Sequence, residues 1–96
     1  MITSHLPAVH VEMEQVIADL AGTVLNSVQN RKDHPTYGNT KTKIRTEGDR
    51  LEGAISMYMV VTGQAFHAGA PNRVIQFQSS DVAERVNAAR DAVVSI

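Results

Sequence analysis

Hydrophobic residues recur at helical spacing over the first third of the chain, and this is the longest periodic stretch in the sequence. On a helical wheel, one set of apolar side chains gathers within about 120° of arc. The set comprises Leu6, Val9, Met13, Val16, Ile17, Leu20, Val24 and Val28. Pro7 suits a first helical turn, where its missing N–H has no helical partner to lose. The pattern predicts a first helix over about residues 5–30.

A second apolar stripe runs along the other side of this helix, through Val11, Ala18, Gly22 and Leu25. Ala18 and Gly22 lie one turn apart, so another backbone can approach closely there. A glycine inside a helix costs about 1 kcal/mol against alanine, which favours a packing role for Gly22. We therefore expect a second packed face that another subunit fills. The alternative is that Gly22 is merely tolerated and the others are scattered surface residues.

Two further helices are predicted, over about 49–67 and 80–95. Residues 49–52 have the spacing of a capping box, and Ser80 is the expected cap of the last helix. Apolar side chains then share one face of each predicted helix: Leu51, Ala54, Ile55, Tyr58, Val61, Ala65 and Phe66, followed by Val82, Val86, Ala89, Val93 and Ile96. Residues 73–78 alternate and suggest a short extended segment. The favoured fold class is mainly α.

An α+β fold is the alternative. Residues 40–46 alternate strictly between Thr or Ile and Lys or Arg, as a strand with a basic outer face does. Ile44 also falls on the apolar face of the following helix, so the same residues suit a helix entry. Ile55, Met57, Met59 and Val61 also alternate, and residues 57–62 are rich in β-favouring side chains. In this alternative, the first and last helices pack on a small antiparallel sheet of residues 39–46, 54–62 and 73–78.

Composition describes a single compact domain spanning residues 1–96. The chain has only two Tyr, two Phe and no Trp, so large side chains for the core are few, and self-association would supply more burial. It has no cysteine, which excludes thiolate catalysis and cysteine-ligated metals. No signal-peptide pattern is visible, and the longest apolar run, residues 57–61, is too short to cross a bilayer. We expect a cytoplasmic protein without membrane contact.

Positive charge is concentrated between residues 31 and 45, although the net charge of the chain is −1. This stretch supplies cations, a glycine turn and an aromatic ring, which together suit an anionic ligand such as a nucleotide or single-stranded nucleic acid. The candidate ligand-binding residues are His34, Tyr37, Asn39, Lys41, Lys43 and Arg45. The alternatives are a solvated basic surface and a site for an acidic protein.

The sequence gives little support for catalysis or metal binding. His10 and Glu14 are spaced i, i+4, but no third ligand is placed by the sequence, and a surface hydrogen bond explains the pair. Glu47, Asp49 and Glu52 are explained as charges near a helix start. No known nucleophile or phosphate-binding motif occurs. We expect no catalytic residues, no metal and no cofactor.

Met57 and Met59 leave an apolar patch on the second predicted helix, and flexible thioether side chains suit an adaptable interface; the alternative is that they belong to the core. With Val11, Ala18, Gly22 and Leu25 they are the candidate interface residues. The sequence therefore predicts a non-enzymatic binding protein, a small stoichiometric inhibitor or adaptor. Its expected partners are itself, as a homodimer or small ring, and an unidentified protein. Binding of an anionic ligand through residues 34–45 is the alternative function.

Overall fold

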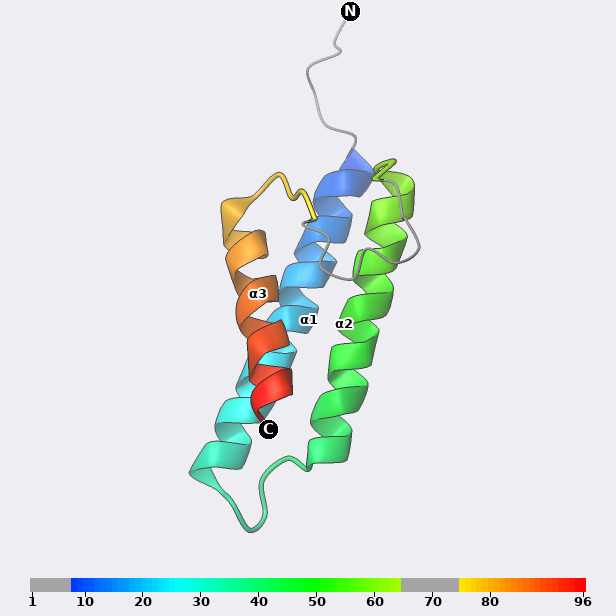
Figure 1. Ribbon diagram of the computed structural model, residues 1–96. Helices are drawn as coiled ribbons and strands as arrows, with labels where there is room; N and C mark the ends of the chain where they lie inside the picture. Colours follow the sequence, from blue (N-terminus) through cyan, green and yellow to red (C-terminus); the bar gives the residue numbers. More distant parts are fainter. Residues whose placement is uncertain (1–7, 65–74) are drawn as a thin grey trace, which may run out of the picture.

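The computed structural model describes residues 8–64 and 75–96 and places them in three helices. These are α1 (Ala8–Asp33), α2 (Lys41–Val61) and α3 (Ser80–Ser95). Figure 1 shows α1 and α2 as an antiparallel hairpin, with α3 running alongside α1 in the same direction as α1. The mainly α prediction is confirmed, and the predicted range of the third helix agrees with α3.

Helix α1 is the central element, because it packs along both α2 and α3, whereas α2 and α3 touch each other much less. Its fully buried apolar side chains are Ile17, Ala21, Val24 and Val28. Met13 and Leu20 on one flank, and Ala18 and Leu25 on the other, are partly buried against the same core. A helix with a neighbour on each side needs a wide apolar arc. The two predicted stripes are the two flanks of that arc.

Helix α2 begins eight residues before the predicted start at 49. Thr40 is its N-cap, and the hydroxyl oxygen of Thr40 accepts a hydrogen bond from the backbone N–H of Lys43. Ile44, in the second turn, is fully buried. The alternation over 40–46 is therefore the helix entry, and the capping-box spacing at 49–52 lies inside the helix.

The small sheet of the α+β alternative is wrong. Residues 41–46 and 54–61 are helical, and the described part of the last predicted strand, residues 75–78, carries no strand. The short extended segment predicted there is likewise not supported. Residues 73 and 74 lie outside the described residues. The strand preference of β-branched and aromatic residues such as Val60, Val61 and Tyr58 spans only about 1 kcal/mol and depends on context, so burial of one helical face decides the outcome.

Helix α2 ends at Val61, before the predicted end at 67. Thr62 is the C-cap, and Gly63 adopts a φ of 75°, a backbone conformation that other residues rarely take. The N–H groups of Gly63 and Gln64 donate to the carbonyls of Val60 and Met59 at 3.2 and 2.9 Å. This is a Schellman arrangement, and it stops the helix. Residues 65–67 of the predicted helix lie outside the described residues.

Helices α2 and α3 approach each other at Gly48 and are linked further along by an ion pair. A Cβ atom placed on Gly48 would lie 3.2 Å from Cγ2 of Val93, so the absence of a side chain brings the two helices close. Further along, the Arg90 guanidinium donates two hydrogen bonds of 2.8 Å to the Glu52 carboxylate. No helix among the described residues is both long enough and apolar enough to cross a membrane.

Candidate functional site

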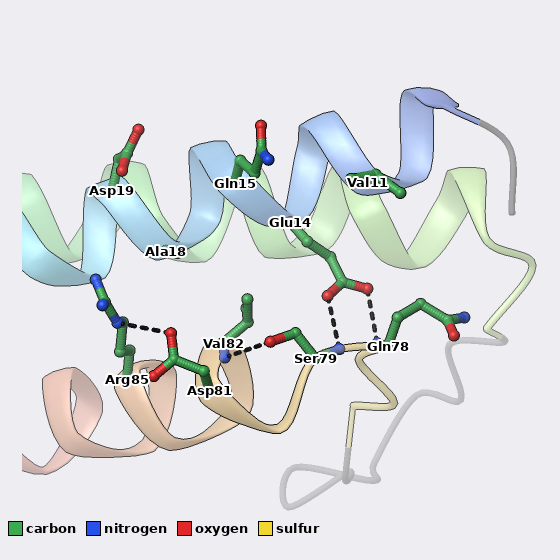
Figure 2. Close-up of a pocket in the computed structure, with 10 residues that line it drawn as sticks. All are labelled: Val11, Glu14, Gln15, Ala18, Asp19, Gln78, Ser79, Asp81, Val82 and Arg85. Carbon is green, nitrogen blue, oxygen red and sulfur yellow. Dashed lines mark hydrogen bonds and ion pairs between the residues drawn. The ribbon is translucent and has the colours of Figure 1, made fainter.

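A buried carboxylate joins all three helices. Glu14 projects from α1 and is only 4 % exposed. Its Oε2 accepts hydrogen bonds from the Tyr58 hydroxyl of α2 and from the backbone N–H of Gln78 at 2.7 Å. Its Oε1 accepts from the backbone N–H of Ser79 at 3.1 Å. Ser79 is the N-cap of α3, so Glu14 holds the start of that helix against α1 (Figure 2). We name Glu14, Tyr58, Gln78 and Ser79 the Glu14 junction.

Tyr58 fills the centre of this junction. Its side chain is 1 % exposed, its ring stacks on Phe77 with centroids 5.4 Å apart, and His10 meets it edge-on at 6.4 Å. Burial raises the pKa of the Tyr58 hydroxyl well above its usual value, and the hydrogen bond and negative charge of Glu14 raise it further. Tyr58 therefore stays protonated and acts as a donor to the carboxylate.

An open groove of about 540 Å³ lies beside the junction, between the N-terminal halves of α1 and α3 (Figure 2). Val11 and Ala18 line it from α1, and Val82 from α3. Arg85 and Asp81 also line the groove and pair with each other at 3.1 Å. The groove is thus a mixed surface, with apolar walls, charges already paired or hydrogen-bonded at Arg85, Asp81 and Glu14, and the exposed carboxylate of Asp19 at its border.

The predicted interface residues divide into three groups. Met59 is 3 % exposed and belongs to the core, and Ala18 and Leu25 pack partly against it. Gly22 has open space around it, because a Cβ added there would meet no atom within 4 Å. Val11 and Met57 are 43 % and 59 % exposed. Helix α3 therefore covers part of the stripe for which the sequence suggested another subunit.

Exposed apolar side chains gather instead on the face of the α1–α2 hairpin that is remote from α3. We name this the open face, formed by Val9 and Val16 of α1 and Met57 and Val61 of α2. Their exposed fractions are 49, 53, 59 and 43 %, respectively. Single exposed apolar residues are ordinary, whereas a contiguous group marks an interaction surface.

Helix geometry places these four residues together. On α1, Val16 lies about 160° around the helix from Ala18, which lines the groove against α3. On α2, Met57 and Val61 lie about 140° and 180° from Glu52, which pairs with α3. Both pairs therefore lie on flanks directed away from α3. The contact between Glu14 and Tyr58 sets these parts of α1 and α2 side by side.

The basic segment does not form the basic strand face of the α+β alternative. Lys41, Lys43 and Arg45 are exposed, but they lie in the first turns of α2. In a helix, Lys41 and Arg45 share one side, and Lys43 lies about 160° from each of them. The structure therefore does not bring the three cations together.

Asn39 is occupied in fixing the turn between α1 and α2. Its backbone N–H donates to Asn30 Oδ1 at 2.8 Å, and its side-chain Nδ2 donates to the buried Ser27 hydroxyl at 3.1 Å. Arg31 donates to the Asn39 carbonyl at 3.3 Å. We name Ser27, Asn30, Gly38 and Asn39 the Asn39 turn. Tyr37, 78 % exposed, packs on the half-buried His34 with ring centroids 4.8 Å apart.

The described residues contain no group of three or more His, Asp or Glu side chains placed to hold a metal ion. His10 and Glu14, the spaced pair in the sequence, both contact Tyr58 rather than each other. Glu14 is the residue whose importance the sequence analysis missed. The sequence does contain a signal for a buried Glu14: on the helical wheel it lies within the apolar arc of α1 that also holds Ile17, Ala21 and Val24.

Comparison with known proteins identified no relative. No family model matches the chain, and neither a curated protein nor a solved structure matches it.

Proposed function

We propose that this protein is a non-enzymatic binding module, a small stoichiometric inhibitor or adaptor that acts through protein–protein contacts. The observation that carries the proposal is the open face, where four apolar side chains are each more than two-fifths exposed. An exposed apolar group of this kind is stabilised when a partner covers it. Met57 lies in it, and its flexible side chain suits an adaptable contact.

The charged groups of the described residues also favour binding over chemistry. The most buried carboxylate, Glu14, is used to hold the start of α3, and its proton-donating neighbour Tyr58 is shielded by Phe77. The binding of an anionic ligand through residues 34–45 stays a prediction, since Asn39 has a structural role and the cations lie on two sides of α2.

Site-specific photocrosslinking in cells tests the proposal. A benzophenone amino acid replaces Met57 on the open face in one variant and Glu84 on the exposed surface of α3 in the control. We expect a discrete protein adduct from position 57 and none from position 84. Absence of any protein adduct from position 57, or the same adduct from both positions, would contradict the proposal.

A further inference from the structure

Charged side chains border the open face unequally on its two helices. On α1, Glu12 and Asp19 lie about 40° and 60° beyond Val16, on the outer edge of the face, where Asp19 also borders the groove between α1 and α3. On α2, Arg50 falls on the same stripe as Met57 and Val61, spaced i, i+7 and i+11. All three charged residues are exposed, and none of them makes an ion pair within residues 8–64 and 75–96.

The face therefore has an acidic edge on α1 and a basic position on α2. Such an arrangement is complementary to itself when the α1 side of one copy meets the α2 side of another. A two-fold axis that runs parallel to the helices produces this pairing, and it produces it twice. The same axis also places the apolar residues of one copy against those of the other. Rotation about an axis parallel to the helices leaves the position of every residue along that axis unchanged.

The heights of the charged residues agree with this arrangement. The contact between Glu14 and Tyr58 gives the approximate antiparallel register, in which Asp19 lies near the level of residue 53 of α2. Arg50 lies three residues from that level, or about 4.5 Å along the axis at 1.5 Å per residue. An arginine side chain spans this offset, so Asp19 of one copy and Arg50 of the other are within reach of each other.

We infer that the occupant of the open face is a second copy of this chain, related by a two-fold axis parallel to the helices. Val9 and Val16 of each copy pack on Met57 and Val61 of the other, and two pairs between Asp19 and Arg50 flank this apolar centre. The inference rests on the proposed function and names its partner. The hydrophobic contact supplies most of the affinity, and the charge pairs set the orientation.

Charge reversal on each edge tests the inference with purified full-length protein. Sedimentation analysis between about 1 and 200 μM should show a dimer for the parent chain. Asp19→Lys alone, or Arg50→Glu alone, places like charges opposite each other and should weaken dimerisation at least tenfold. An equimolar mixture of the two variants restores both pairs across the interface, so it should form a heterodimer with the parent affinity.

Glu84→Lys is the matched control, because it reverses an exposed charge on α3 and should leave dimerisation unchanged. Thermal melts of the diluted variants verify that each one still folds. A parent chain that remains monomeric at 200 μM, or a mixture no tighter than the single variants, overturns the inference. If such a monomer still gives an adduct with a different protein from position 57, the second-copy inference fails and the proposed function stands.

Discussion

Hydrogen bonds hold the connecting segments in place at both ends of the three-helix bundle, but the chemical groups that make these bonds differ. At one end, the Glu14 junction fixes α3 through a buried carboxylate that contacts backbone groups 64 and 65 residues away in the chain. At the other end, the Asn39 turn fixes the α1–α2 connection mainly through neutral amide and hydroxyl groups 9 to 12 residues apart, with one longer hydrogen bond of 3.3 Å from the Arg31 guanidinium to the Asn39 carbonyl. The distant segment is held by charge-assisted hydrogen bonds to a buried carboxylate, which are the stronger kind, and the local turn mostly by neutral ones.

Glu14→Ala should have the largest effect on this comparison. It leaves the Tyr58 hydroxyl and the N–H groups of Gln78 and Ser79 without their acceptor, so we expect a loss of about 3 to 5 kcal/mol in the free energy of unfolding. Urea denaturation followed by circular dichroism measures it. Gln15→Ala, on the exposed side of the same helix, is the control and should change stability by less than about 0.5 kcal/mol. Equal small losses in both variants would show that the junction is dispensable.

Gly38→Ala tests the packing of the Asn39 turn, at the opposite end of the bundle, because it adds a methyl group there. The added Cβ atom would lie 2.6 Å from the His34 carbonyl oxygen and 2.7 Å from that of Asn30, so the backbone must move. We expect destabilisation by about 2 kcal/mol. Gly53→Ala meets no atom within 4 Å and lies in a helix, so it should stabilise the protein by up to about 1 kcal/mol. Opposite signs for the two glycines would confirm that the turn is tightly packed, and a neutral Gly38→Ala would refute it.

Tyr58→Phe should have the smallest effect at neutral pH, about 1 to 2 kcal/mol, because Glu14 keeps its two backbone donors. The pH dependence is more informative. The pKa of the folded-state hydroxyl is raised by burial and by Glu14, so its contribution is complete below about pH 10, the unfolded value. The contribution is lost as the pH rises further, since the unfolded state then releases the proton first.

Stability measured between about pH 8 and 11 should therefore fall less steeply in Tyr58→Phe than in the parent protein. Tyr37→Phe, at an exposed ring, is the control and should follow the parent curve. A parent curve and a Tyr58→Phe curve of the same slope would show that the alkaline loss arises elsewhere. Tyr58→Phe does not alter the Asn39 turn, so the hydrogen bonds of that turn should not contribute to the difference between the two curves.

Helical periodicity predicted the three elements because each helix buries a continuous stripe of apolar side chains. It misplaced the start of α2, because Thr40 caps as well as Asp49 would, and the burial of Ile44 adds two turns. It could not show that the two stripes of α1 serve two neighbours within one chain. That outcome depends on where α3 packs, and the spacing of the apolar residues in α1 gives no information about the position of α3.

The candidate site was less accessible to sequence reasoning. Met57 was expected at a surface and is exposed there, while Met59 lies two residues away in the core. In a helix these two side chains point about 160° apart, so they do not share the single apolar patch that was predicted for them on the second helix. The role of Glu14 depends on backbone groups at Gln78 and Ser79, and no local pattern around Glu14 indicates such distant donors.

Among the described residues, charged side chains give the molecule a lengthwise electrical polarity, opposite in sign to the one that its helix dipoles produce. Because α1 and α3 run the same way, two partly positive helix starts share one end, and two partly negative helix ends share the other. Glu12, Glu14, Asp19 and Glu84 lie toward the first end, and Arg31 and Lys32 close α1 at the second. Lys41, Lys43 and Arg45 stand at the start of the one reversed helix, where they oppose its own dipole yet compensate the ends of its two neighbours. The electric field of a charged surface therefore orients the molecule lengthwise, and the end that carries the Asn39 turn approaches a negatively charged surface first.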